Sequence, residues 1–249
     1  MRKPTPRALA RRAYHLSQRV RHRRGYRIKR DADGMLRPRV YEAIYDAVKD
    51  APDGDWLEIG GARGGSTVAI ATAMRDSSKR GRLVTVEKFE GGSWEQTYHS
   101  PAYGDNYSWW MRNVRKFGVL DRVTLYPHGV TDETADEVRQ LICSPLAGMM
   151  LDADGWVGRD FRHFWPMLRF GGVIIVDDYP TSADNPHEKK ARTYHLMNAI
   201  IRWGLYEITS RHADTVIGFK PAGANFDRFD MGELEYIAER HANGEKIEW

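Results

Sequence analysis

The sequence predicts an α/β fold: a doubly wound, mostly parallel sheet of seven strands with a C-terminal antiparallel hairpin and an N-terminal helical arm. Three observations support this prediction. Short apolar segments alternate with segments of helical periodicity, as in repeated β-α units. A glycine-rich loop joins the first apolar segment to the helix that follows it. The segment 173–176 is entirely aliphatic, as expected of a strand whose sheet is covered on both faces.

The expected elements begin with an arm helix over 7–20, whose apolar side chains fall on one face with arginines opposite. Gly25 and the segment 31–34 are expected to interrupt the chain, and a second helix spans 37–49. The strands are expected at 56–59, 82–87, 122–126, 147–151, 173–176, 206–209 and 215–219. The helices that alternate with them are expected at 66–74, 107–117, 134–142, 161–168, 192–203 and 232–241.

Charge divides the chain into a basic arm and an acidic remainder. Residues 1–30 hold twelve Lys and Arg and no Asp or Glu, which leaves 26 basic against 34 acidic residues in the rest. We therefore predict two parts, a basic helical arm over 1–34 and a domain over 35–249. The arm is expected to contact a second subunit of a homo-oligomer or an anionic membrane surface, with nucleic acid the less favoured partner.

Composition argues against several other classes of protein. The 249 residues are enough to bury a core, and no run approaches the roughly 18 apolar residues of a membrane-spanning helix. The basic N-terminal segment lacks the apolar core of a secretory signal. The single cysteine, Cys143, cannot form an intrachain disulfide. We therefore expect a cytoplasmic protein, peripheral to a membrane if the arm binds lipid.

The sharpest motif is WLEIGGARGGST, over 56–67, in which a strand leads through a glycine loop into a helix. Gly60 and Gly64 allow a ligand to approach the backbone, and the free N–H groups at the helix start can bind an electron-rich group. The dinucleotide fingerprint G-x-G-x-x-G fits poorly, because Ala62 stands at its second glycine. Glu58 suits a ligand that carries an ammonium group. A plain β-α turn is the structural alternative.

A second acidic residue, Glu87, ends the next strand 23 residues after Gly64. In doubly wound folds, a carboxylate at this position binds the hydroxyls of a ribose. Glu87 therefore predicts a nucleoside cofactor, and it fits NAD as well as S-adenosylmethionine (SAM). The alternative is a solvated glutamate on the surface.

Four carboxylates follow the fourth and fifth strands, and these are Asp152, Asp154, Asp177 and Asp178. The carboxyl ends of parallel strands meet at one edge of the sheet, where ligands bind in open α/β folds. Unpaired carboxylates repel one another, so we expect Mg²⁺ or another hard divalent cation there, unless lysine or arginine neutralises them. Neighbours on a strand face opposite ways, so Asp177 and Asp178 can share an ion only if the chain turns between them. Capping of turns or helices is the structural alternative.

The segment 56–67 resembles motif I of class I SAM methyltransferases, in the E-[IL]-G-x-x-x-G-x-S form of the metal-dependent small-molecule O-methyltransferases. The resemblance implies a Rossmann-like fold in which Glu58, Gly60, Gly64 and Ser66 surround the methionine part of SAM. The loop after the third strand lines the adenine in this class, and the matching positions are Gly129 and Val130.

The segments LDADG and WPMLRFGGVIIVDDY resemble SAM methyltransferases of the macrocin O-methyltransferase and cephalosporin-biosynthesis type, and the likeness covers 56–179. It implies that Asp152, Asp177 and Asp178 bind the metal, with Asp152 also at the cofactor, and that Asp154 is the general base. The chain departs from the family's pattern at 155–157, where it has Gly-Trp-Val, so the resemblance does not carry over to the acceptor side.

We therefore expect a SAM-dependent O-methyltransferase that acts on a hydroxyl of a small molecule of sugar, polyketide or phenol type. The alternatives are a nucleic-acid methyltransferase that uses the basic arm, an NAD enzyme, and a scaffold that has lost its chemistry. The long loop over 89–107, rich in aromatic residues and containing His99, is expected to form part of the acceptor pocket. The polar segment 180–195 is the second candidate for this role.

Overall fold

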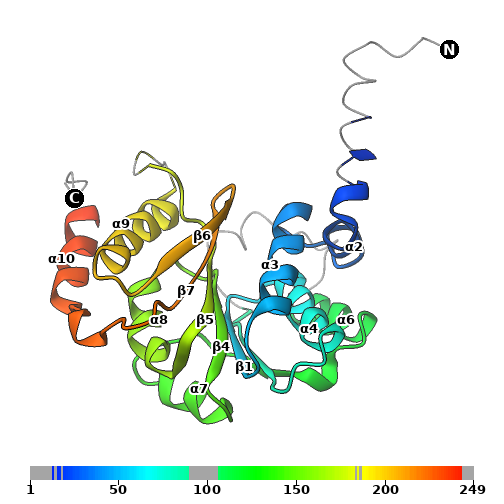
Figure 1. Ribbon diagram of the computed structural model, residues 1–249, viewed down its shortest axis with the longest axis horizontal. Coiled ribbons are helices and arrows are strands. Elements are labelled where there is room, and N and C mark those ends of the chain that lie inside the picture. The colour runs from blue at the N-terminus through cyan, green and yellow to red at the C-terminus, as the bar shows by residue number, and fades with distance from the viewer. Residues whose placement is uncertain are drawn as a thin grey trace.

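A central sheet lies between two layers of helices in the computed structural model of the chain (Figure 1). The structure describes residues 13, 16, 17, 19–89, 106–182, 184 and 187–242. The sheet order is β3-β2-β1-β4-β5-β7-β6, in which the first five strands are parallel and β7 is antiparallel to both of its neighbours. This arrangement confirms the predicted fold, including the C-terminal hairpin. The strands are β1 Asp55–Ile59, β2 Leu83–Val86, β3 Val123–Tyr126, β4 Leu146–Leu151, β5 Leu168–Val176, β6 Glu207–His212 and β7 Thr215–Phe219.

The helices divide between the two faces of the sheet (Figure 1). One layer consists of α2 Arg23–Asp31, α3 Pro38–Asp50, α4 Gly65–Asp76 and α6 Asn106–Lys116. The other consists of α7 Ala135–Leu141, α8 Val157–Phe164, α9 Glu188–Arg202 and α10 Met231–Ala242. Short 3-10 turns occupy Leu120–Arg122, Trp165–Met167 and Phe226–Arg228.

Alternation along the strands creates a separate apolar core on each face. On β1, Leu57 and Ile59 pack with the layer that contains α8 and α9, whereas Trp56 packs with α3 and α4. On β4, Met149 and Met150 divide in the same way. Burial on both faces explains why β4 is apolar throughout rather than alternating with polar residues, and why β1 is buried along its whole length.

Several predicted boundaries differ from the observed ones, and two of these differences have a clear physical cause. Gly25 lies inside α2 and does not interrupt the chain. It is a glycine for packing reasons: α2 passes so close to the start of α3 that a Cβ on Gly25 would lie 1.8 Å from the carbonyl oxygen of Pro38. The helix expected at 161–168 is α8, which begins at Val157 and ends at Phe164. Pro166 has no N–H to continue an α-helix, and the chain passes into a 3-10 turn there.

Part of the predicted basic arm packs against the domain. Ile28 and Ala32 are buried in the same core as α3 and α4. Leu16 and Val20, by contrast, are 63% and 77% exposed. Much of the helix expected over 7–20 lies outside the described residues, and the boundary at residue 34 and the partner of the arm remain predictions.

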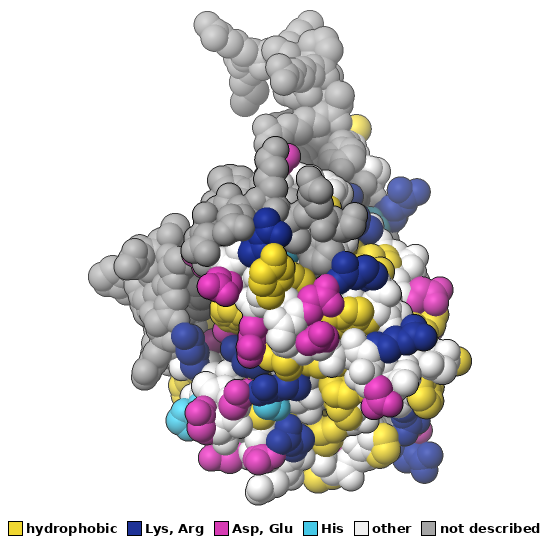
Figure 2. All heavy atoms as spheres, turned by 90° about the vertical axis from the view of Figure 1, so that its left-hand side faces the viewer, with side chains coloured by type: hydrophobic (Ala, Val, Ile, Leu, Met, Phe, Trp, Pro, Cys, Tyr) yellow, Lys and Arg dark blue, Asp and Glu magenta, His cyan; other side chains and the backbone are white. Residues whose placement is uncertain are grey.

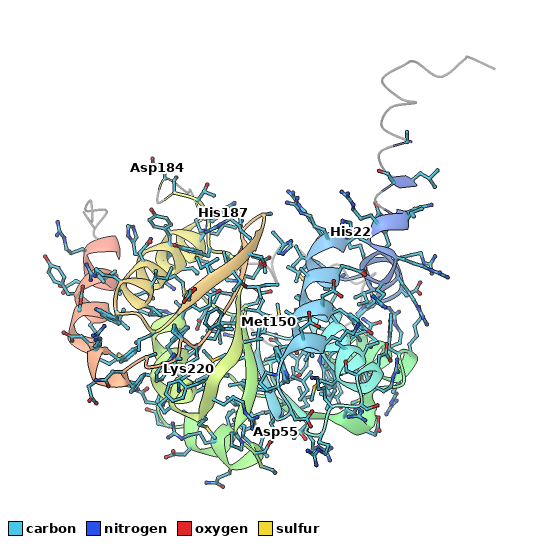
Figure 3. The ribbon with its side chains drawn as sticks, in the orientation of Figure 1. His22, Asp55, Met150, Asp184, His187 and Lys220 are labelled. Carbon is cyan, nitrogen blue, oxygen red and sulfur yellow. The ribbon has the colours of Figure 1, made fainter. Side chains whose placement is uncertain are left out.

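The parallel strands run toward the edge of the sheet that carries the candidate site. Asp55, the first residue of β1, lies at the lower edge in Figure 3, and His187, which precedes α9, lies at the upper edge. The face seen in Figure 2 carries acidic and basic side chains interspersed with apolar ones over its described part. No helix in the described part of the chain combines the length and the apolar content needed to cross a membrane.

Candidate active site

Four predicted site residues lie one position beyond the ends of the central strands and continue the backbone ladder of the sheet. The amide of Gly60 donates to the Val86 carbonyl (2.9 Å), and that of Asp152 donates to the Ile59 carbonyl (2.8 Å). The amides of Glu87 and Asp177 donate in the same way, to the carbonyls of Tyr126 (3.1 Å) and Leu151 (3.0 Å). The rigid sheet therefore fixes all four residues in one row at its carboxyl edge.

The glycine loop passes directly over the end of β4. Gly60 and Gly64 have φ angles of 97° and 82°, in the left-handed region that favours glycine. A Cβ on Gly60 would lie 2.1 Å from the carbonyl oxygen of Asp152. Ala62 also has a positive φ, of 42°. Ser66 lies in the first turn of α4, where backbone N–H groups are available to a ligand.

Glu58 is completely buried and joins three elements of the fold. Its Oε2 accepts hydrogen bonds from the hydroxyls of Thr67 on α4 (2.5 Å) and Thr85 on β2 (2.9 Å). Thr67 Oγ1 in turn accepts a bond from the indole N–H of Trp110 on α6 (3.1 Å). Burial raises the pKa of Glu58 to about 7, although the hydroxyls of Ser66, Thr67 and Thr85 oppose the shift. Glu58 thus supports the loop from beneath, and its predicted contact with the methionine part of SAM is a proposal.

Glu58→Gln is expected to flatten the pH dependence of stability. The folded protein holds the Glu58 proton more tightly than the unfolded chain, whose pKa is near 4.5. The resulting stabilisation is complete below about pH 4.5 and is lost as pH rises through about 7, and a shift of this size corresponds to about 3 kcal/mol. Urea unfolding of both proteins at about pH 5 and about pH 8 checks this. The variant should gain about 1 to 3 kcal/mol relative to wild type between the two pH values; no relative change would contradict the assignment.

Glu87 contacts the glycine loop through its side chain. Its Oε2 accepts a hydrogen bond from the amide of Ala62 (2.6 Å), and its Oε1 accepts one from the amide of Phe89 (3.1 Å). Gly129 lies beside this strand end, since a Cβ on it would meet Lys88 at 3.9 Å. Val130 is buried in the core on the side of the sheet that carries α7. The residues predicted for ribose and adenine therefore lie near one strand end, and their roles remain proposals.

Asp152, Asp177 and Asp178 form the predicted carboxylate cluster. One carboxylate oxygen from each lies within 4.8 Å of the others. The cluster depends on a turn directly after β5: Asp178 has a φ of 57°, which brings its side chain to the same side as that of Asp177. Asp177 also accepts a hydrogen bond from the hydroxyl of Thr215 on β7. Three oxygen ligands in this arrangement suit a hard divalent cation.

Two lysines from the first turn of α9 contact the cluster, and the sequence reasoning did not identify them. Lys189 Nζ lies 2.9 Å from Asp152 Oδ1 and 2.7 Å from Asp178 Oδ2. Lys190 Nζ lies 3.4 Å from Asp178 Oδ1 and 2.5 Å from Asp214 Oδ2. The available signal was the pair of lysines in the polar segment 180–195, which was expected to face the strand ends.

Lys189 and Lys190 partly neutralise the cluster, which was the alternative to a metal ion that the sequence left open. Burial raises the pKa of Asp152 to about 8, with the charges of Asp177 and Asp178 adding to the shift and Lys189 opposing it. Burial, followed by the charge of Asp178, also raises the pKa of Asp177. Burial opposes ionisation of Asp178 as well, but Lys189 and Lys190 together lower its pKa. Positive charge at this edge therefore stabilises the ionised carboxylates.

Asp154, the predicted general base, stands outside this cluster. Its carboxylate, which is about half exposed, accepts hydrogen bonds from Arg159 (2.9 and 3.3 Å) and from the amide of Trp156 (3.0 Å). Burial would raise its pKa, but Arg159 and the hydrogen bonds lower it overall. A carboxylate held in this way is a weaker base than a free one, so Asp154 can act only when Arg159 releases it.

The segment that departs from the family's pattern lies beside Asp154. Trp156 is 38% exposed and stacks against Arg192 of α9, whose guanidinium lies 4.4 Å from the ring centre. Arg192 also donates to the Asp154 carbonyl (3.1 Å). An exposed aromatic ring beside Asp154 is suited to contact a small organic acceptor. The segment 90–105, which carries most of the aromatic loop and His99, lies outside the described residues.

Residues 57–179 match the family model Methyltransf_24, described as a methyltransferase domain. The fold is similar to that of the O-methyltransferase NovP, at 19% identity over 76% of this chain and 82% of that chain, with a TM-score of 0.57. It is also similar to TomG of Streptomyces achromogenes, an O-methyltransferase involved in tomaymycin synthesis and solved with SAM. The identity is 16% over 81% of this chain and 89% of that chain, with a TM-score of 0.54. A third similar structure is an O-methyltransferase from Bacillus cereus in complex with S-adenosylhomocysteine. Its identity is 17% over 80% of this chain and 90% of that chain, with a TM-score of 0.56. Among curated proteins, none matches the chain by sequence.

At these identities the solved structures establish the fold, which is that of the class I methyltransferases, and the family match establishes the domain. The chain is therefore a class I methyltransferase, the class that uses SAM as its methyl donor. More particularly, residues 57–179, which match the Methyltransf_24 methyltransferase domain, include the glycine loop, Glu87 and the carboxylate cluster.

Proposed function

We propose that the protein is an O-methyltransferase that transfers the methyl group of SAM to a hydroxyl of a small organic molecule, with a divalent cation such as Mg²⁺ bound beside the cofactor. The observation that carries the proposal is the convergence of three aspartate oxygens within 4.8 Å, in the same row of residues as the glycine loop. Three solved structures of similar fold are O-methyltransferases by name, which supports oxygen as the methyl acceptor.

The residues present fit both groups that this chemistry requires. Asp152, Asp177 and Asp178 offer the carboxylate oxygens that Mg²⁺ prefers, and burial raises the pKa of Asp152, so a bound cation would stabilise its ionised form. SAM carries a nucleoside and a methionine part, and these would lie between Glu87 and the start of α4. A bound divalent cation lowers the pKa of a coordinated hydroxyl and fixes its orientation, while SAM supplies an activated methyl group.

The contribution of the chain is positioning and proton removal. The ladder of backbone hydrogen bonds holds the cofactor loop and the carboxylates in fixed register, which supports in-line transfer between two bound reactants. Asp154 would take the proton of the acceptor hydroxyl after exchanging its bond with Arg159 for one with the acceptor. Trp156 would pack against the acceptor near the same carboxylate.

The proposal predicts methyl transfer to a hydroxyl that depends on a cation. Purified protein should convert SAM to S-adenosylhomocysteine in the presence of one class among catechols, hydroxylated polyketides and sugars, each assayed with Mg²⁺ and with EDTA. EDTA should reduce the rate by at least about 100-fold. Calorimetric titration with SAM and with NAD provides the control, and only SAM should bind. Binding of NAD in place of SAM would overturn the proposal, and turnover that is unaffected by EDTA would remove the cation from it.

A further inference from the structure

The ammonium group of Lys189 occupies the place in the carboxylate cluster where a divalent cation would be held. Its Nζ lies 2.9 Å from Asp152 Oδ1 and 2.7 Å from Asp178 Oδ2, so one ammonium bridges two of the three aspartates. The third, Asp177, accepts its bond from the hydroxyl of Thr215, a neutral donor. Lys189 is therefore the cation that bridges two members of the cluster.

The position of Lys189 is fixed by its surroundings. The residue lies in the first turn of α9, and its carbonyl oxygen accepts a hydrogen bond from the hydroxyl of Thr193 (2.9 Å). Its stem packs on the loop after β4, where a Cβ on Gly155 would lie 3.2 Å from Lys189 Cγ. Gly155 has a φ of 85°, and this tight loop leaves room for the lysine. The side chain is about one-third exposed, so its ammonium group has a path to solvent.

Lys189 and a metal cannot use the same oxygens together. Mg²⁺ binds carboxylate oxygens at about 2.0 to 2.1 Å, so an ion on Asp152 Oδ1 and Asp178 Oδ2 would crowd an ammonium that lies within hydrogen-bond distance of both atoms. Two cations on the same oxygens also repel each other. Lys190 differs, because it reaches only Asp178, at 3.4 Å, and has its own partner in Asp214.

We propose that Lys189 is an internal competitor of the metal: the divalent cation binds in exchange for the ammonium group, which must leave Asp152 and Asp178. The inference rests on the metal part of the proposed function. The cation binds only to molecules in which Lys189 has withdrawn. The apparent affinity is then the intrinsic affinity multiplied by the fraction of such molecules. Released from the carboxylates, Lys189 lies at the edge of the site, where the segment after β5 leads into α9.

Lys189→Met keeps the apolar stem that packs on Gly155 and removes the charge. Binding of Mn²⁺, followed by electron paramagnetic resonance of the free ion, should be at least about tenfold tighter in this variant than in wild type. The matched control is Lys190→Met, which removes an equal charge from the adjacent residue and should change the affinity by less than about threefold. Equal or weaker Mn²⁺ binding by Lys189→Met than by wild type would overturn the proposal.

A second measurement uses the unaltered protein. Acylation of lysines, located by mass spectrometry, should increase at Lys189 by at least about threefold when Mn²⁺ is saturating, because its ammonium group has lost both carboxylates. Lys190 should change less. Mn²⁺ binding without a change at Lys189 would overturn the exchange and leave the metal site intact. Failure of wild type and both variants to bind Mn²⁺ would instead remove the cation from the proposed function, and the exchange with it, while SAM binding would be unaffected.

Discussion

Asp177→Ala is expected to weaken Mg²⁺ binding by at least about 100-fold while leaving the affinity for SAM within about threefold of wild type. Asp177 is the cluster member that forms no ion pair with Lys189 or Lys190, and it accepts a hydrogen bond from Thr215 on β7. Its removal therefore takes away an oxygen ligand without releasing Lys189 or Lys190 from Asp178. Because Asp177 lies at the end of β5, two strands away from the glycine loop on β1, SAM binding should survive.

Calorimetric titration with Mg²⁺ and with SAM measures both affinities. Asp214→Asn is the matched control: it also removes one carboxylate charge near the cluster, but that carboxylate pairs with Lys190. The control should retain Mg²⁺ binding within about threefold, since Asp214 is partly exposed and screened. If Asp177→Ala binds Mg²⁺ as wild type does, Asp177 is not a ligand and the carboxylate cluster is structural.

Gly60→Ala is expected to destabilise the fold by at least about 3 kcal/mol, which lowers Tm by about 6 to 12 °C for a domain of this size. Two effects combine at this position. The φ of 97° is strained for any L side chain, and the added methyl would lie 2.1 Å from the Asp152 carbonyl oxygen, a backbone atom that cannot move alone. SAM binding should fall at least about tenfold, since relief of the contact must separate the loop from β4.

Gly171→Ala separates the two effects. Gly171 also has a positive φ, of 72°, but a Cβ there would meet nothing within 4 Å. This control should cost about 1 to 2 kcal/mol from backbone strain alone and leave SAM binding unchanged. Thermal unfolding and calorimetric SAM titration of both variants make the comparison. Equal losses of stability in the two variants would show that the contact with Asp152 contributes nothing.

The sequence predicted the sheet well because the central strands β1, β2, β4 and β5 contain compact apolar segments that are buried, whereas the edge strand β6 is polar and largely exposed. The same logic gathered Asp152, Asp177 and Asp178, since parallel strands end at one edge. The sequence also indicated that Asp177 and Asp178 could meet only if the chain turned between them, because neighbours on a strand face opposite ways. The turn is made by a left-handed φ at Asp178. It could not be predicted, because aspartate tolerates that conformation without requiring it.

The basic partners of the carboxylates escaped prediction for a common reason, which is the position at which two helices begin. α8 begins at Val157 and α9 at Glu188, each four residues before the expected start, and these turns carry Arg159 and Lys189. The N-cap residues, Trp156 and His187, make no side-chain capping bond, so neither start carries the usual sequence signal. Glu58 illustrates a different limit: the hydroxyls that bind it come from α4 and β2, so its partners depend on tertiary packing.

The row of residues one position past the strand ends links the two halves of the site mechanically. Val86, Ile59 and Leu151 accept in turn from Gly60, Asp152 and Asp177, so backbone bonds run without interruption from the end of β2 to the end of β5. The spacing between the glycine loop and the aspartates is therefore set by the sheet and not by side chains. In the proposed function, the cofactor and the cation would then be held at a fixed separation, whichever of the two binds first.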